Sequence, residues 1–219
     1  VVLDDLNGYD ENLWALGKIY AYSLQDEPFL HIDSDVYFWE PFSQELESAA
    51  LVAQHEEKDY EMYTVVMQWV QDFPYLPDVF VDDLDNNRPI VAANAGIMGG
   101  CDLEFFQKLW SEVRLFLEKN KSSMQQVKVG LLNNIYEQYL FARLAEKYGI
   151  QIAYLFQNMD ANYHGLFDFY ATPHHKKFVH VVGAHKRAIK ACQWVSYRLQ
   201  SEFPDYYHKI RHLVYEHQI

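Results

Sequence analysis

Cysteine is scarce in this chain, whose 219 residues include only two thiols, Cys101 and Cys192. Two cysteines are too few for a disulfide scaffold or a four-cysteine zinc site, so we interpret them as core or incidental residues in a reducing compartment. Long apolar runs are also missing, and none approaches the ~20 residues that a membrane-spanning helix requires. These absences predict a cytoplasmic protein without a transmembrane segment.

Positively charged residues are also scarce. The chain has 18 Lys and Arg residues and 31 Asp and Glu residues, which gives a formal net charge of −13. No basic block stands out, so general affinity for a nucleic-acid backbone is not expected. An acidic protein can still bind a diphosphate if a metal ion or a few well-placed cations offset the repulsion.

Half of the residues are hydrophobic and 16% are aromatic, a composition typical of a globular protein with one sizeable core. Strand-like and helix-like segments alternate, which predicts an α/β fold whose mostly parallel sheet is covered by helices on both faces. We expect a single domain over residues 1–219 that ends in two helices at about 188–217, and a polar loop at 82–89. The expected strands are 29–32, 51–54, 90–98, 150–156 and 177–182. The other expected helices are 11–25, 41–50, 60–73, 103–120 and 133–148.

Two carboxylates follow the first expected strand, in the motif Asp33-Ser34-Asp35. Side chains at i and i+2 lie on one side of an extended chain, and a turn after the strand can aim both at one point. Ligands bind at the carboxyl ends of strands in open α/β sheets. Mg²⁺ and Mn²⁺ favour such oxygen ligands, with substrate phosphates completing the shell. Asp33 and Asp35 therefore predict a metal site, and a solvated acidic loop is the alternative.

A second motif, His180-x-x-Gly183-x-x-Lys186, follows the last expected strand. A neutral imidazole is a good third ligand for Mn²⁺. Gly183 would let the backbone approach a phosphate closely, and Lys186 would place a point charge on a diphosphate. The alternative is a His at a strand edge that is followed by a basic helix start.

A third segment, Asn94-Ala95-Gly96-Ile97-Met98, lies between these two motifs along the chain. Together the three segments resemble the motifs of GT-A-fold glycosyltransferases. They are most similar to the glycogenin-like and lipopolysaccharide-galactosyltransferase-like group, and also to a bacterial branch of predicted glycosyltransferases. The resemblance covers most of residues 11–190 and implies the fold of a nucleotide-diphospho-sugar transferase.

The resemblance also implies how a donor is bound. The donor would be a nucleotide-diphosphate sugar, with a UDP-sugar favoured, and the acceptor would be a hydroxyl of a glycan or of a lipid-linked molecule. Mn²⁺ or Mg²⁺ on the donor diphosphate would be held by Asp33, Asp35 and His180. The donor phosphates would be contacted by Gly183 and Lys186. The donor-sugar pocket would be lined by Asn94, Ala95 and Gly96.

Glu137 and Gln138 lie near the point where the family has an acidic residue and a Gln that contact the transferred sugar. We therefore predict that they are catalytic, together with Lys186, which would stabilise the departing diphosphate. The resemblance favours retention of the anomeric configuration, and Glu137 would be the base if the reaction inverted it. The alternative is that Glu137 and Gln138 belong to an exposed helix face.

The chain departs from the family in two places. Lys186 is followed by Arg187-Ala188, where the family often has Pro-Trp. The family's first nucleotide-binding strands, which lie well before the Asp-x-Asp, have no counterpart, so we expect this chain to be the back part of a longer protein.

Two other functions are compatible with the same residues. A degenerate transferase fold could bind a carbohydrate or a partner protein without catalysis. A haloacid-dehalogenase-like phosphatase would use Asp33 as nucleophile and Asp35 as general acid, with 79–83 imitating the acidic metal motif of that family. The sequence does not predict an oligomeric state.

Overall fold

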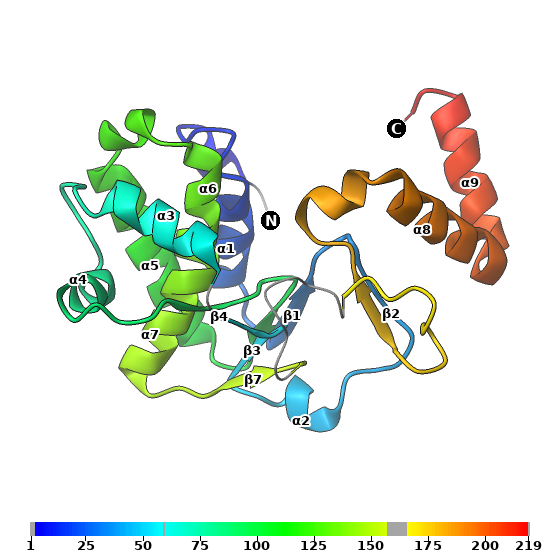
Figure 1. Ribbon diagram of the computed structural model, residues 1–219, viewed down its shortest axis with the longest axis horizontal. Helices are drawn as coiled ribbons and strands as arrows, with labels where there is room; N and C mark the ends of the chain where they lie inside the picture. Colours follow the sequence, from blue (N-terminus) through cyan, green and yellow to red (C-terminus); the bar gives the residue numbers. More distant parts are fainter. Residues whose placement is uncertain (1–2, 59, 157–165, 219) are drawn as a thin grey trace. The chain divides into compact units, whose positions relative to one another are not determined.

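The computed structural model describes residues 3–58, 60–156 and 166–218 of the chain (Figure 1). The chain forms two compact units. Unit 1 comprises Val1–Asp33 and Phe42–Asn162, and unit 2 comprises Ser34–Pro41 and Tyr163–Ile219. The expectation of one domain stays a prediction, and each unit is described by itself below.

Unit 1 contains a four-stranded sheet with the strand order β1-β6-β3-β7. These strands are β1 (Phe29–Ile32), β6 (Ile97–Gly100), β3 (Leu51–Ala53) and β7 (Ile152–Tyr154). β6 is antiparallel to both of its neighbours, whereas β3 and β7 are parallel. The described part of this sheet is therefore mixed, and not mostly parallel as expected.

The difference arises at the segment 90–98, which was expected to be one strand. It forms two short strands, β5 (Val91–Ala93) and β6, and β5 pairs with β4 (Glu56–Lys58) in a separate sheet. The chain enters β6 directly from the β4–β5 pair and not from a helix that covers the sheet, so the crossover geometry that makes strands parallel does not set the direction of β6. Gly99 and Gly100 let β6 fit between its neighbours, since a Cβ on either residue would lie 2.1 Å from a backbone oxygen.

The helices of unit 1 gather on one side of this sheet (Figure 1). Leu51, Ala53 and Met98 from the sheet share a buried core with the aromatic side chains of α5, among them Phe105 and Phe106. Burial of each large side chain contributes about 1.5–3 kcal/mol. The helices are α1 (Trp14–Ser23), α3 (Glu61–Val70), α4 (Asp78–Asp85), α5 (Leu103–Lys119), α6 (Val129–Asn134) and α7 (Leu140–Tyr148), with the short α2 (Gln44–Glu47) apart.

Two helical segments differ from the expected pattern. The expected polar loop begins inside α4, because Val79 and Phe80 are buried and anchor this acidic segment as a helix. The expected helix 133–148 is interrupted by a π-helical segment, Ile135–Tyr139, whose five residues are all buried. Such π segments are rare and occur frequently at functional sites. This one carries both Glu137 and Gln138.

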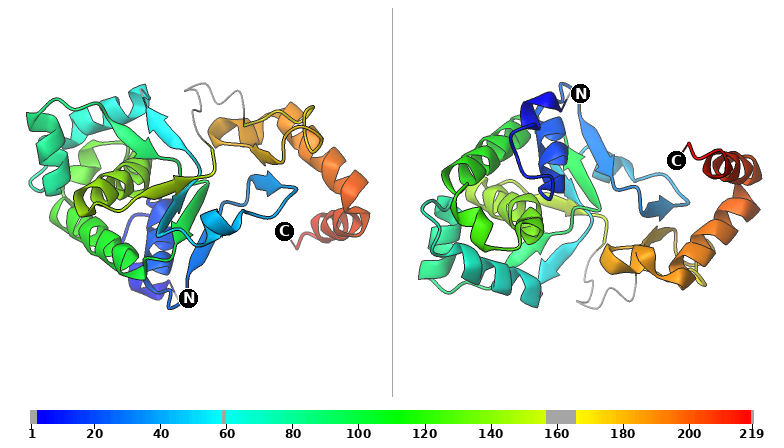
Figure 2. Two further views of the ribbon diagram at one scale, coloured as in Figure 1. Left: turned by 90° about the horizontal axis from the view of Figure 1, so that it is seen from below. Right: turned by 90° about the horizontal axis from the view of Figure 1, so that it is seen from above.

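Unit 2 pairs β2 (Val36–Phe38) with β8 (Phe178–His180) in an antiparallel ladder. A 3₁₀ turn, η4 (Gly183–Arg187), leads into the consecutive helices α8 (Ile189–Glu202) and α9 (Pro204–Tyr215) (Figure 2). The buried core of this unit is small and contains Phe169, Val179 and Val181. No helix in the described ranges is both long and apolar enough to cross a membrane.

Candidate metal centre and the polar networks of unit 1

The β2–β8 ladder brings Asp35 and His180 together. Val36 lies opposite His180 in the ladder, and the backbone N–H of Val181 donates to the carbonyl of Asp35 at 3.0 Å. As a result, Nε2 of the buried His180 lies 3.5 Å from Oδ1 of Asp35. The ladder therefore fixes an imidazole beside a carboxylate from a segment about 145 residues away in the sequence.

Lys186 supplies a cation to the same carboxylate. Its Nζ lies 3.1 Å from Oδ2 of Asp35, and it belongs to the exposed turn η4. Burial alone would raise the pKa of Asp35, but the hydrogen bond and charge of His180, followed by those of Lys186, lower the pKa to about 2. Asp35 is therefore a carboxylate anion at neutral pH. Gly183 opens this turn with a φ of +57°, a conformation that favours glycine.

Asp33 directly follows β1, and its side chain belongs to a polar network in unit 1. Its backbone N–H donates to the carbonyl of Gly96 at 3.0 Å, so the Asn94–Gly96 turn lies directly beside it. Its Oδ1 lies 2.9 Å from both Lys18 Nζ and His31 Nε2. Burial opposes ionisation of Asp33, but the hydrogen bond from His31 and the charge of Lys18 outweigh burial and lower its pKa.

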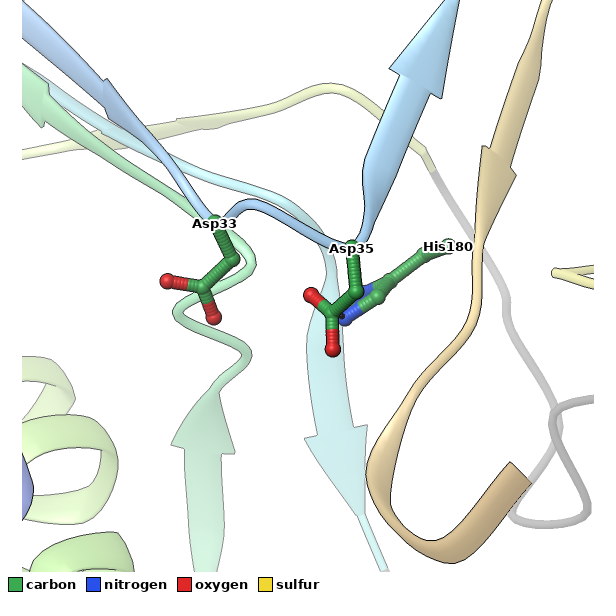
Figure 3. Close-up of side chains that lie close together, drawn as sticks. All are labelled: Asp33, Asp35 and His180. Carbon is green, nitrogen blue, oxygen red and sulfur yellow. Dashed lines mark ion pairs between the residues drawn. The ribbon is translucent and has the colours of Figure 1, made fainter. Parts of the chain in front are cut away.

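The two predicted motifs meet in space. One ligand atom from each of Asp33, Asp35 and His180 lies within 4.8 Å of the others (Figure 3). Figure 3 shows the carboxylate of Asp35 beside the imidazole of His180, with Asp33 on the same turn of the chain. Two carboxylates and an imidazole suit Mn²⁺, and the carboxylates also suit Mg²⁺. This donor set fits the predicted metal site, and metal binding by these three residues stays a prediction.

Glu137 is buried, and not on an exposed helix face. Its side chain is 1% exposed, and its Oε1 lies 2.7 Å from Lys18 Nζ. Burial raises the pKa of Glu137 to about 7, although Lys18 partly offsets this effect. Because the same ammonium contacts Asp33, Lys18 links the π-helical segment to the Asp-x-Asp motif.

Sequence reasoning missed Lys18, although one signal was available. Lys18 is the only charged residue in the otherwise apolar helix α1. Burial alone would lower the pKa of Lys18, but Glu137 and Asp33 outweigh burial and raise it. Lys18 therefore stays an ammonium ion while it is mostly buried.

A second buried network surrounds Asn94 and Gln138. Asn94 donates from Nδ2 to Oε1 of Glu57 at 2.7 Å and accepts at Oδ1 from the N–H of Gly96 at 3.0 Å. The hydroxyl of Tyr63 hydrogen-bonds to Glu57 and lies 3.3 Å from Oε1 of Gln138. Asn94 therefore fixes the conformation of the turn beside Asp33. The predicted contact of Asn94 with a donor sugar would have to use the same amide groups that already bond to Glu57 and Gly96. Sequence reasoning also missed Glu57, which is buried in β4.

The segment 79–83 of the phosphatase hypothesis lies in helix α4. There the carboxylate of Asp83 accepts from Nε of Arg143 at 2.6 Å and from the hydroxyl of Tyr139. Both contacts are to Oδ2, which is thus occupied within unit 1. Nothing in this arrangement favours the phosphatase hypothesis.

Comparison with known proteins identifies a family. The model of a family of unknown function, DUF6734, matches residues 1–213. The chain belongs to the DUF6734 family. No curated protein and no solved structure is significantly similar to this DUF6734 protein. Family membership therefore names no activity, and the function has to be argued from the chemistry of the site.

Proposed function

We propose that this DUF6734 protein is a metal-dependent glycosyltransferase that moves a sugar from a nucleotide-diphosphate donor to an acceptor hydroxyl. The observation that carries the proposal is the convergence of Asp33, Asp35 and His180. Three protein ligands leave further coordination positions for phosphate oxygens, which is how Mg²⁺ and related ions are usually bound beside a nucleotide. When bound, the ion would neutralise the charge that develops on the departing diphosphate.

The residues around the ligands fit this reaction. Lys186 lies at the exposed side of Asp35, where its ammonium can meet a phosphate, and Gly183 leaves the backbone of the turn uncrowded. A cation that faces the leaving group stabilises the transition state more than the ground state. The resemblance to retaining transferases supports retention of the anomeric configuration.

We assign Glu137 a positioning role in this reaction. It is buried, and its described ion pair is with Lys18, which in turn contacts Asp33. Glu137 would therefore hold Lys18, and through it the first metal ligand, in place. A general base would have to lie within hydrogen-bond distance of the acceptor hydroxyl to take its proton. A side chain with 1% exposure cannot reach that hydroxyl unless the residues that cover it move.

The first test is calorimetric titration of UDP into the protein with and without Mn²⁺, using the wild type and the Asp35→Ala variant. We expect binding that requires Mn²⁺ and that weakens by at least about ten-fold in the variant, because ligand groups of a metal site dominate its affinity. The matched control is Asp26→Ala, which removes an exposed carboxylate.

Two results would contradict the proposed function. One is that neither UDP nor GDP, nor another nucleoside diphosphate, binds in a Mn²⁺-dependent way. The other is that Asp35→Ala binds as tightly as the Asp26→Ala control. Either result would leave a carbohydrate- or partner-binding module as the better account of the fold.

A further inference from the structure

A pocket of about 540 Å³ opens in unit 1, among α3, α4, the loop after α4 and the π-helical segment. This volume lies within the range of small-molecule sites, roughly 300–1,000 Å³. Several of its lining side chains carry hydroxyl, amide or charged groups: Thr64, Gln68, Gln71, Asp83, Asn87 and Arg88. The pocket shares no lining residue with the metal site.

Asp83 is a buried carboxylate in this pocket, and one of its oxygens accepts no hydrogen bond from the described residues. Its side chain is 5% exposed. Oδ2 accepts from Arg143 and Tyr139, whereas Oδ1 has no hydrogen-bond partner among the described residues. Nη1 of Arg88 lies 3.8 Å from Oδ1, beyond hydrogen-bond distance. A buried carboxylate oxygen without a donor is costly, so this position favours a bound group that donates a hydrogen bond.

The charges around Asp83 favour a neutral donor. Arg143 and Arg88 both face Asp83, and both also pair with Glu146, so two positive and two negative groups balance. An added cation would meet two guanidinium groups, and an added anion would meet the Asp83 oxygen that accepts no hydrogen bond. A hydroxyl group donates to that oxygen without adding charge.

The rest of the lining narrows the class of ligand. Thr64, Gln68, Gln71 and Asn87 each carry groups that can donate and accept, as the hydroxyls of a sugar also do. The half-buried Tyr60 adds an aromatic surface, which suits the apolar faces of a sugar ring. We propose that this pocket binds a neutral saccharide, one hydroxyl of which donates to Oδ1 of Asp83. The proposal does not depend on the proposed transferase activity, because it requires neither a metal nor a nucleotide.

Saturation-transfer NMR tests the proposal, with glucose, galactose, mannose, N-acetylglucosamine, maltose and lactose as probes, in EDTA and without nucleotide. We expect at least one probe to bind the wild type, and Asp83→Asn to bind it at least about ten-fold more weakly. Gln68→Trp should have the same effect by filling the pocket from an exposed position on α3 that makes no described hydrogen bond. The matched control is Gln107→Trp, an exposed position on α5 outside the pocket.

Asp83→Asn could unfold because it weakens the pairing with Arg143. In that case Gln68→Trp still tests the proposal, because it leaves the Asp83–Arg143 pair intact. Binding of no probe to the wild type would overturn the proposal, as would equal binding by Gln68→Trp and Gln107→Trp. Binding of tetramethylammonium in place of the saccharides, with the same sensitivity to Gln68→Trp, would also overturn it. Failure of the UDP titration would leave the proposal intact, since the two experiments share no ligand and no variant.

Discussion

The Lys18→Met protein should lose about 3–5 kcal/mol of its free energy of unfolding at pH 8. Glu137 is 1% exposed, and Lys18 is its counter-ion at 2.7 Å. Removal of one partner of a buried ion pair leaves an uncompensated charge in the interior, and such losses are typically of this size. Urea denaturation of the wild type and the variant measures the difference.

Two further variants separate the buried pair from a general effect of losing a lysine. The double variant Lys18→Met/Glu137→Leu should recover much of the loss, because a buried pair replaced by apolar side chains is often nearly neutral. Lys108→Met removes an exposed lysine that pairs with Glu104 at 2.8 Å, and it should cost much less stability than Lys18→Met, because exposed ion pairs contribute little. Equal losses of stability for Lys18→Met and Lys108→Met would contradict the prediction, because they would show that Glu137 does not need Lys18 as its counter-ion.

The same pair predicts how stability depends on pH. Burial raises the pKa of Glu137 from its ordinary value of 4.5 to about 7, so the folded protein binds this proton more tightly than the unfolded chain. The resulting stability is fully present below about pH 4.5 and is lost as the pH rises through about 7. The wild type should therefore lose about 3 kcal/mol relative to Glu137→Gln between pH 5 and pH 8. Parallel pH profiles for the two proteins would contradict this assignment.

The candidate metal ligands could be predicted from the sequence, because each follows a short apolar strand. A strand followed by Asp33-Ser34-Asp35 and another ending at His180 are local patterns. Their convergence depends on the β2–β8 ladder, which joins segments about 145 residues apart, and pairing over such a distance is not encoded in either segment alone. The resemblance supplied the pairing that residue patterns could not.

The burial of Lys18, Glu57 and Asp83 was not predicted, for a common physical reason. Each is a charged residue whose burial depends on partners from distant elements: Glu137 for Lys18, Asn94 and Tyr63 for Glu57, and Arg143 and Tyr139 for Asp83. A charged residue in isolation predicts an exposed position, because an unpaired buried charge is costly. The mixed sheet was missed similarly, because strand direction depends on what connects the strands and not on their apolar pattern.

Replacement of Lys186 should strengthen metal binding and slow turnover. Nζ of Lys186 lies 3.1 Å from Oδ2 of Asp35, so the ammonium would compete with a metal ion for that carboxylate. Lys186→Met should therefore raise the affinity for Mn²⁺ in the absence of nucleotide by about two- to five-fold, the value of a partly exposed ion pair. If the proposed function holds, the same variant should release UDP from a UDP-sugar about 10²–10³-fold more slowly, because a cation on the leaving group is lost.

The two readouts are independent. Electron paramagnetic resonance of free Mn²⁺ measures metal affinity without any nucleotide, and a coupled assay of UDP release measures turnover over a panel of UDP-sugars. Lys186→Arg should restore part of the turnover, because it keeps the charge with a different geometry. Lys190→Met, which removes an exposed lysine at the start of α8, should change neither quantity. Weaker Mn²⁺ binding by Lys186→Met, together with slower turnover, would contradict this prediction. Lys186 would then stabilise the metal site, and its ammonium would not move from Asp35 to the diphosphate.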